Sequence, residues 1–378
     1  MLKKVLCLAL SAIMVLSMLV GCGQNGSQDA QDTQDGSKED GFKIGFANGY
    51  IGNTWRSQFV DSIEKVAEEY KAQGIISEYQ IANSNADVNE QLNQINAMIN
   101  SGMDAIIIDP VSATALGSVV EMAQEKGIMV VISNDIAAYE GTYAVVNDID
   151  AMWRIQAKWF AEKLNGKGNI VEITGLPGNT SDQQRIDAAE DVFKDYPDIK
   201  VLASAPGKWS ESTAQSVMST FLSTYDNIDG VLLQDVMSNG VLRAYENAAK
   251  TPPIMSGDCI LSYIHYWAEH PELESIAVPS VPAIGANTLK VTVRLLQGKE
   301  VKDEYWTANP LDESLKNTII LPPPFVITNS GEAGAWMDGY NLTDSISVAD
   351  AVKMGEGQAE EYQLDQMMSD ETIDGFFK

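Results

Sequence analysis

Short apolar runs alternate with longer amphipathic segments along the chain from residue 42 onward. The runs are rich in Val and Ile and show little polar alternation. Near-continuous apolar runs of this length are typical of strands that are buried on both faces of a parallel sheet. The predicted strands are Lys43–Ala47, Tyr79–Ala82, Ala105–Asp109, Met129–Ser133, Tyr143–Val146, Ile170–Thr174, Val201–Ala205, Gly230–Leu233, Ile254–Ser256 and Ser275–Val278.

Between these runs, apolar residues recur at helical spacing. In Asn89–Asn100, for example, Leu92, Ile95 and Ile99 fall on one face of a helix. The other predicted helices are Thr54–Lys71, Thr114–Lys126, Met152–Leu164, Asp182–Lys194, Thr213–Thr224 and Ala283–Leu296. Strands that alternate with helices predict an α/β fold of doubly wound parallel sheets. So many strands exceed what one lobe of ordinary size holds, so we expect two lobes.

Open parallel sheets bind ligands in the crevice beyond the carboxyl ends of their strands. The residues that follow the predicted strands are 48–56, 83–87, 134–135, 147–148, 176–185, 207–209, 234–235, 258 and 280. Most of them are polar, and turn or cap formation explains many Asn, Asp and Ser residues at such positions. It does not explain Trp55 and Trp209, which occur in two of these stretches. We expect both indoles to face one cleft, with packing in the core as the alternative.

The charge balance excludes several classes of partner. The chain has 378 residues, with 25 Lys and Arg against 53 Asp and Glu, so the formal net charge is −28. Binding to nucleic acid requires basic groups that displace counterions from phosphates, and binding to an anionic lipid surface requires basic groups as well. The excess of acidic over basic residues works against both, so we expect no nucleic-acid partner and no direct adsorption to lipid.

The first residues are typical of an export signal. Lys3 and Lys4 precede an apolar stretch, Val5–Val20, that is shorter than the roughly 20 residues of a spanning helix. Leu19-Val20-Gly21-Cys22 resembles a bacterial lipobox, which implies cleavage after residue 21 and acylation of Cys22. The alternative is a plain signal peptide with an incidental cysteine. We expect an extracytoplasmic protein anchored to the cell membrane through Cys22, of the surface-lipoprotein type found in Gram-positive bacteria.

Residues 22–41 contain almost no large apolar side chains, so they cannot bury enough surface to offset the entropy of ordering. We interpret them as a flexible acidic tether. After removal of the signal peptide, Cys22 and Cys259 are the only cysteines, and Cys22 is expected to carry lipid. No disulfide is therefore expected, and Cys259 is interpreted as a small buried residue.

Several segments together resemble the type 1 periplasmic binding proteins of sugar ABC importers, in the branch that binds ribose, galactose and galactofuranose. The resemblance covers about residues 43–301. The order and spacing of the matching segments are more specific to this family than any one segment. The segments are KIGFANGYIGNTWR, GMDAIIIDPVSATAL, VVISND, GLPGNTSDQQR, VLASAPGKWS, GVLLQD with GVLRAYENA, PIMSGD and SVPAIGANTLKVTVRLLQGKEV.

The resemblance implies two lobes joined by three chain crossings, near Val146–Asp148, Pro279–Val281 and Asn317–Leu321. The N-terminal lobe would comprise residues 42–147 and 281–320. The C-terminal lobe would comprise residues 148–280 and 321–378, the last part being an acidic extension without a functional interpretation. The relatives that act as repressors carry a DNA-binding headpiece, whereas this chain has the lipobox at that place.

The resemblance also implies the ligand contacts. Trp55 and Trp209 would stack on the sugar, Asp135 would accept hydroxyl hydrogen bonds, and Arg56 and Arg185 would reach into the cleft. Together with Leu176 from a strand-end stretch, the expected ligand-binding residues are Trp55, Arg56, Asn85, Asp135, Asn147, Leu176, Arg185, Trp209, Asp235, Asp258 and Ser280. Position 136, commonly Arg in the family, is Ile136 here. This departure leaves the identity of the sugar open.

The expected site would hold three acids, Asp135, Asp235 and Asp258, and two arginines. Such a charge suits a neutral sugar or an amino sugar, and disfavours phosphorylated or carboxylated ligands. We expect a binding protein that closes around a pentose, hexose or furanose and delivers it to a membrane permease. The alternatives are a sensor that feeds a chemoreceptor or histidine kinase, and a binder of a non-sugar polyol, amino sugar or nucleoside.

An enzyme is the rival class, and little in the sequence favours it. His265 and His270 are five residues apart, whereas a helical metal-binding pair is four apart. No nucleophile elbow or Cys–His arrangement is visible. Asp109 is interpreted as a cap of the turn after its strand. We therefore expect no enzymatic activity, no cofactor, no metal site and a monomeric state.

Overall fold

The structure is a computed structural model that describes residues 38, 40–340, 342 and 344–378. The expected signal peptide, the lipobox with Cys22 and nearly all of the expected tether lie outside the described residues. Within them, every helix is too short or too polar to cross a bilayer.

The first sheet contains only parallel strands, in the order β11-β5-β4-β3-β1-β2. The strands are β1 (Phe42–Asn48), β2 (Ile76–Asn83), β3 (Ala105–Asp109), β4 (Met129–Ser133), β5 (Tyr143–Asn147) and β11 (Thr318–Leu321). Its helices are α1 (Thr54–Ala72), α2 (Val88–Ser101), α3 (Gly117–Glu125) and α9 (Ile284–Leu296). Buried residues of α1 and α9 pack on one face of the sheet, and those of α2 and α3 pack on the other. These elements form the first lobe.

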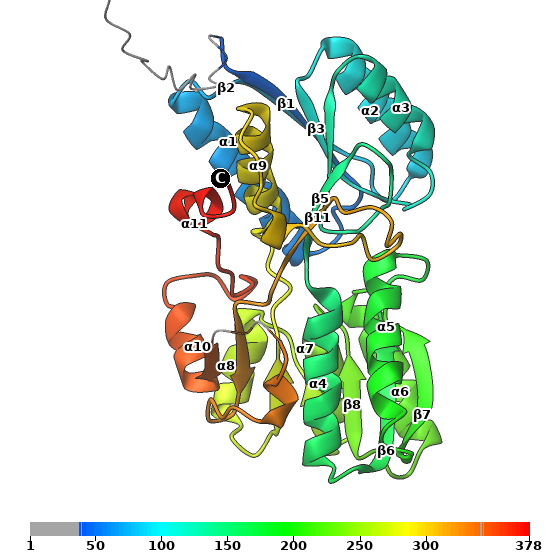
Figure 1. The fold of residues 1–378 in the computed structure, drawn as a ribbon. Coiled ribbons are helices and arrows are strands. Elements are labelled where there is room, and N and C mark those ends of the chain that lie inside the picture. The colour runs from blue at the N-terminus through cyan, green and yellow to red at the C-terminus, as the bar shows by residue number, and fades with distance from the viewer. Residues whose placement is uncertain (1–37, 39, 341, 343) are drawn as a thin grey trace, which may run out of the picture. The chain divides into compact units, whose positions relative to one another are not determined.

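The second sheet has the order β13-β12-β10-β9-β8-β6-β7, and only the β10–β12 pair is antiparallel. The strands are β6 (Lys167–Thr174), β7 (Asp198–Pro206), β8 (Gly230–Leu233), β9 (Ile254–Ser256), β10 (Ser275–Ala277), β12 (Phe325–Thr328) and β13 (Asp344–Ser347). Helices α4 (Ile149–Lys163) and α5 (Thr180–Phe193) cover one face. Helices α6 (Glu211–Thr224), α7 (Ser238–Asn247) and α8 (Leu261–Glu269) cover the other. These elements form the second lobe (Figure 1).

Three expected crossings join the lobes. The chain passes from β5 to α4 at residues 147–149 and from β10 to α9 at residues 278–283. The third passage, expected at Asn317–Leu321, comes slightly later, because Thr318–Leu321 form β11 beside β5 before the chain continues to β12. The first and third crossings touch, since the Asp148 backbone N–H donates to the carbonyl of Leu321 at 2.8 Å. The two-lobed α/β fold agrees with the prediction.

The C-terminal part of the chain adds a fourth crossing that the sequence did not indicate. We expected all of residues 321–378 on the second lobe. Helix α10 (Val348–Met354) does pack on α8, but α11 (Asp370–Asp374) packs on α9 of the first lobe (Figure 1). Two causes fix α11 there. Ile373, Phe376 and Phe377 join the hydrophobic core of the first lobe, and Asp370 and Asp374 pair with Arg294.

We call residues 359–378 the C-terminal strap. Its first part follows the second lobe, where Ile260 pairs with Gln363 and the backbone N–H of Leu364 donates to Cys259. Its middle lies at the crossings. There the Gln58 side chain of α1 exchanges two hydrogen bonds with the backbone of Gln363, and the Asp365 carboxylate accepts from the Ala283 N–H. The strap therefore connects both lobes beside the hinge.

Two short 3₁₀ helices complete the described elements. They are η1 (Asp303–Tyr305) and η2 (Ala335–Met337).

Candidate ligand-binding site

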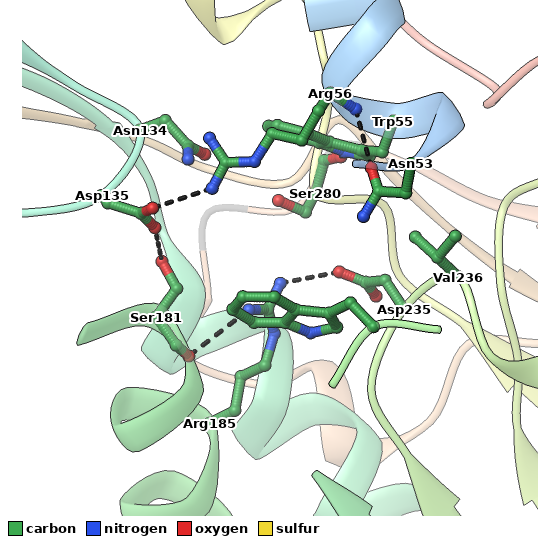
Figure 2. Close-up of a pocket in the computed structure, with 11 residues that line it drawn as sticks. Asn53, Trp55, Arg56, Asn134, Asp135, Ser181, Arg185, Asp235, Val236 and Ser280 are labelled. Atoms are coloured by element: carbon green, nitrogen blue, oxygen red, sulfur yellow. Dashed lines mark hydrogen bonds and ion pairs between the residues drawn. The ribbon is translucent and has the colours of Figure 1, made fainter. Parts of the chain in front are cut away.

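A cavity lies where the carboxyl ends of both sheets meet the crossings. It contains about 370 Å³ of space that no atom fills, including space open to solvent. Its lining residues come from α1, from strand-end loops of both lobes, from α5 and from the second crossing. They are Asn53, Trp55, Arg56, Asn134, Asp135, Ser181, Arg185, Trp209, Asp235, Val236 and Ser280 (Figure 2).

The start of α1 presents an aromatic and a cation to this cavity. The side chain of Asn53 caps the helix by accepting from the Arg56 backbone N–H at 2.9 Å, so Trp55 and Arg56 fall in the first turn. The Trp55 indole stacks on Phe59 with 5.4 Å between ring centres, and its N–H donates to the Ser280 carbonyl at 2.5 Å. The indole is thus fixed at both its face and its edge.

The Arg56 guanidinium lies between two buried carboxylates. Its Nη1 is 2.5 Å from Asp109 Oδ2, and its Nη2 is 2.8 Å from Asp135 Oδ2. Burial alone would lower the pKa of Arg56, but the two carboxylates outweigh burial and raise it. The cation is therefore permanent. It also lies over the Trp55 ring, with 5.2 Å from its central carbon to the ring centre.

Asp135 belongs to the first lobe but bonds to the second. Its Oδ1 accepts from the Ser181 hydroxyl at 2.6 Å (Figure 2). Its Oδ2 accepts from the Asn179 amide at 3.0 Å. Burial would raise the pKa of Asp135, but Arg56 and these two donors lower it below the usual range. An ionised Asp135 thus connects the lobes directly across the cavity.

The second lobe supplies its own cation, anion and aromatic. Arg185 on α5 donates from Nη2 to Asp235 Oδ2 at 2.6 Å. Its guanidinium lies between Trp153 and Trp209, 5.8 Å from the centre of each ring. The Trp209 N–H donates to the Gln234 side chain at 3.1 Å. Burial raises the pKa of Asp235, and Arg185 offsets only part of this effect.

The structure gathers most of the expected site residues around the cavity, namely Trp55, Arg56, Asp135, Arg185, Trp209, Asp235 and Ser280. The other expected residues do not line the cavity. Asn147 is adjacent and donates to Ser280 Oγ at 3.3 Å, and Leu176 lines a neighbouring space. Asn85 is absent from the cavity lining and has a left-handed backbone, with φ of 52°.

Asp258, which we expected among the ligand contacts, bonds to the protein backbone. Its two carboxylate oxygens accept the backbone N–H groups of Val236 at 2.5 Å and Ser238 at 2.8 Å, at the start of α7. Burial and the nearby Asp235 raise the pKa of Asp258 to about 7. Asp258 thus supports the loop that carries Val236, and does not line the cavity.

The sequence reasoning did not single out four lining residues: Asn53, Asn134, Ser181 and Val236. The first three fall in the strand-end stretches and resemble ordinary caps, and two of them have local roles. Asn53 caps α1, and Ser181 follows the Asn179 cap of α5. Their cap-like residue types therefore did not distinguish them from the other strand-end residues. Val236 has a backbone φ of 65°, which no sequence pattern indicated.

Two further spaces adjoin the cavity. One of about 820 Å³ shares Arg56, Asp135 and Trp209 with it and has apolar walls that include Tyr50 and Leu176. The other, of about 1000 Å³, shares Asn53, Trp209 and Val236, and is bordered by residues of α6, α8 and the C-terminal strap. Trp209 therefore stands where all three spaces meet.

The two histidines considered for enzymatic chemistry do not line this cavity. His265 pairs with Glu360 at 3.0 Å, and His270 stacks on Tyr266 with 3.9 Å between ring centres. Over the described part of the chain, no group of His, Cys, Asp and Glu side chains has the geometry to hold a metal ion. Cys259 is a buried free thiol whose pKa is raised by burial.

Comparison with known proteins identifies the family. Residues 44–300 match the family described as periplasmic binding protein domain, which is more than half of the chain. The protein therefore belongs to this family, as its sequence segments predicted. Membership implies a location outside the cytoplasm.

Individual relatives agree with this assignment. The chain is 35% identical over 226 residues to the xylitol-binding protein of Mycolicibacterium smegmatis, covering 58% of this chain and 61% of that protein. It is 26% identical over 247 residues to the ribose import binding protein of Bacillus subtilis, covering 64% of this chain and 78% of that protein. The crystal structure of an ABC transporter solute binding protein from Thermobispora bispora superposes with a TM-score of 0.74 at 23% identity, covering 88% and 94% of the two chains.

Proposed function

We propose that this protein is the substrate-binding component of an ABC importer and binds a small, neutral polyhydroxylated ligand, a sugar or sugar alcohol, in the cavity between its lobes. One observation carries the proposal. Trp55 and Trp209, from opposite lobes, line one cavity together with two arginine–aspartate pairs. The names of the relatives, which bind xylitol and ribose, support the same class of ligand.

The charge of the lining favours a neutral ligand. Arg56 pairs with Asp135, and Arg185 pairs with Asp235, so the charged lining residues sum to zero. We had expected three acids and two arginines, and therefore a net charge of −1. The lining is neutral because the third acid, Asp258, bonds to backbone N–H groups and does not line the cavity. A phosphate or carboxylate on the ligand would have to displace an aspartate from its arginine. A hydroxyl can donate to the carboxylate and accept from the guanidinium without breaking the pair.

The polar lining also provides specificity. A hydrogen bond to a charged group contributes roughly 1.5–3 kcal/mol, and a buried partner left without its bond costs a similar amount. A ligand that lacks one hydroxyl therefore loses affinity twice. The indole rings cover the C–H faces of the ligand and exclude water from these bonds.

Closure follows from the contacts of both lobes with one ligand. A ligand that bonds to both lobes favours the closed arrangement by its difference in affinity for the two arrangements. A micromolar ligand provides about 8 kcal/mol of binding free energy, and part of it can bias this equilibrium. We propose that a membrane permease recognises the closed form, that Cys22 carries the lipid anchor and that the protein acts as a monomer.

A thermal-shift panel tests the ligand class. Xylitol, D-ribose and D-galactose are compared with ribose 5-phosphate as the charged counterpart. At 100 times its dissociation constant, a ligand adds about 2.7 kcal/mol of stability, so a true ligand gives a clear rise in melting temperature. We expect at least one neutral compound to raise it and the phosphate to leave it unchanged. A panel in which only the phosphate acts would contradict the proposal.

A pair of variants locates the site. Asp235→Asn removes the charge that faces Arg185, and we expect it to abolish the shift. Asp350→Asn is the matched control, because Asp350 is an exposed aspartate of the second lobe that pairs with Lys353 at 2.8 Å, outside the cavity lining. The control should keep the full shift. Equal shifts in both variants would place binding elsewhere.

A further inference from the structure

Asp109 is a fully buried carboxylate behind the wall of the cavity, at the end of β3. Its exposed fraction is 0%. It is absent from the lining of the ligand cavity, but it contributes to the lining of the adjoining space of about 820 Å³. From the sequence we expected it to cap the turn after its strand. Among the described contacts, its carboxylate does not bond to that turn. It accepts the backbone N–H of Gly49, in the loop after β1, at 3.4 Å, and its other bonds go to residues around the cavity.

The two oxygens of Asp109 hold two different elements of the site. Oδ2 is 2.5 Å from Nη1 of Arg56, on α1. Oδ1 accepts from the Asn134 amide at 3.1 Å and from the Asp135 backbone N–H at 3.4 Å, in the turn after β4. Asn134 has a φ of 61°, in the left-handed region that non-glycine residues rarely occupy, so this turn depends on such support.

We propose that Asp109 is a positioning residue for ligand binding, because it fixes Arg56 and Asp135 in the arrangement in which Asp135 bonds to the second lobe. This inference rests on the proposed function and deepens it. Asp109 does not touch the ligand. It acts through the guanidinium and the turn that it holds.

The effect of Asp109 extends across the cavity through a continuous chain of bonds. Asp109 holds Arg56, Arg56 bonds to Asp135, and Asp135 accepts from Ser181 on α5. No direct bond joins Asp109 to Ser181 among the contacts of the described residues. Any energetic coupling between these two residues must therefore pass through Arg56 and Asp135.

The charges around Asp109 agree with this role. Facing it are Arg56 from α1, Asp135 and Asn134 from the turn and the Gly49 backbone, while Gln91 of α2 donates to its carbonyl. One guanidinium is thus shared by two buried carboxylates. Burial raises the pKa of Asp109 to about 6, although Arg56 opposes this effect. Asp109→Asn keeps the shape of the side chain and removes the charge that holds Arg56.

A double-mutant cycle on sugar affinity tests the inference. Calorimetric titration with xylitol and D-ribose compares the wild type, Asp109→Asn, Ser181→Ala and the double variant. We expect each single variant to weaken binding at least tenfold, a factor that corresponds to about 1.4 kcal/mol. The double variant should be at most about threefold weaker than the weaker single variant, since both break one chain. A double variant whose loss equals the product of the two single losses would overturn the inference. A merely structural role of Asp109 predicts additivity.

Asp370→Asn is the matched control. Arg294 lies between Asp370 and Asp374, at 3.1 Å from each, as Arg56 lies between Asp109 and Asp135. This second arrangement is in the first lobe at α9 and α11, outside the cavity lining. Both aspartate variants should lower the urea midpoint of unfolding, but only Asp109→Asn should lower affinity. Equal losses of affinity would overturn the inference.

A crystal structure of Asp109→Asn separates this inference from the proposed function. If the wild type binds no sugar of the panel, the proposed function fails, and the positions of Arg56 and Asp135 in the variant still decide the role of Asp109. We expect the guanidinium and the turn to move. Unchanged positions would overturn the inference even if the wild type binds sugar. Asp109→Ser, which is too short to reach Arg56, replaces the asparagine variant if that variant does not fold.

Discussion

Replacing Gly175 with alanine should displace Trp209 without removing its ring. Gly175 directly follows β6, and a Cβ atom built on it would lie 2.3 Å from Cε2 and 2.4 Å from Cζ2 of Trp209. It would also lie 2.6 Å from Oε1 of Gln234, the atom that accepts the indole N–H. Carbon atoms prefer a separation of about 3.5–4.0 Å. The ring must therefore shift by about 1 Å or more and lose its hydrogen bond.

The size of the effect follows from the cost of overpacking. An extra methyl group in a tightly packed place typically costs 1–3 kcal/mol. If the displaced ring can no longer cover the ligand, the same free energy appears as lost affinity. At 1.4 kcal/mol for each tenfold change, binding should weaken between about 5-fold and 150-fold.

Calorimetric titration with xylitol and D-ribose measures this loss, and circular dichroism checks the fold. Gly117→Ala is the control. Gly117 begins α3, the nearest atom to its added Cβ is 3.8 Å away on Tyr139, and neither residue lines the cavity. The control should bind as the wild type does. A folded Gly175→Ala protein with unchanged affinity would refute the role of Trp209 as a wall of the site.

Two further predictions concern stability and anchoring. Burial raises the pKa of Glu172, on β6, to about 7, so the folded form holds a proton that the unfolded chain releases, and stability falls as the pH rises from about 4.5 through 7. Glu172→Gln should remove this slope. Its effect on the free energy of unfolding should be more favourable at pH 8 than at pH 5 by roughly 3 kcal/mol. Urea unfolding at both pH values measures this difference, and the same effect of the substitution at both would contradict the reasoning. Cys22→Ser should move the protein from the membrane fraction to the soluble fraction of an expressing bacterium, and retention on the membrane would contradict lipid attachment at this residue.

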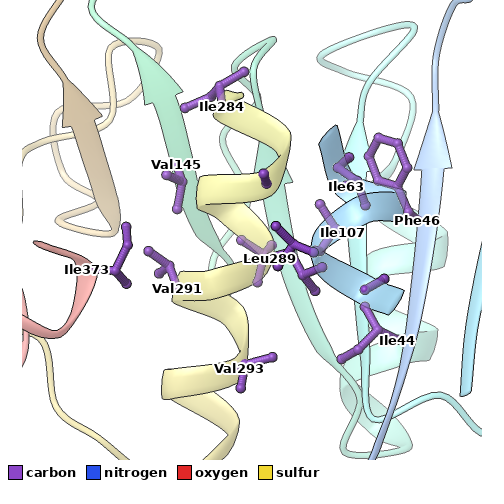
Figure 3. Packing of buried hydrophobic residues seen from close by; sticks show 14 of the residues in the cluster. Ile44, Phe46, Ile63, Ile107, Val145, Ile284, Leu289, Val291, Val293 and Ile373 are labelled. Atoms are coloured by element: carbon purple, nitrogen blue, oxygen red, sulfur yellow. The ribbon is translucent and has the colours of Figure 1, made fainter. Parts of the chain in front are cut away.

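The alternation of apolar runs and helices predicted both sheets because burial on two faces leaves a strong local pattern. Strand β3 shows this most clearly, since all five of its residues are buried. Ile107 packs toward α9, whose Leu289 and Val291 lie beside the first sheet with Ile44 and Val145 (Figure 3). Neighbouring Ile106 and Ile108 pack on the opposite face.

The site was predictable to the extent that it follows strand ends. Trp55 and Asp235 could be located because loops after parallel strands converge on one edge. The direction of a single side chain was not predictable. Asp258 turns to the backbone of Val236 and Ser238, and nothing local in the sequence signals those N–H groups. The partnership of Asp109 with Arg56 likewise joins residues of different elements that no local pattern relates.

The path of the C-terminal strap could not be predicted either, because no local pattern in its sequence indicates its contacts. Its apolar anchors, such as Leu364, Ile373 and Phe377, are separated by polar residues without the period of a strand or a long helix. Helix α11 has only five residues, too few for an amphipathic stripe to be recognised. Its position depends on the core of the first lobe, which is built from residues far away in the chain.

The return of the strap to α9 gives the second lobe a topological property. The polypeptide enters that lobe twice and leaves it twice, so the described chain both begins and finishes on the first lobe. In this respect the second lobe is an insertion with no loose end. Tension applied to the two ends of the folded chain must therefore act on the first lobe before it reaches the inserted one, and fraying from either terminus begins in the first lobe.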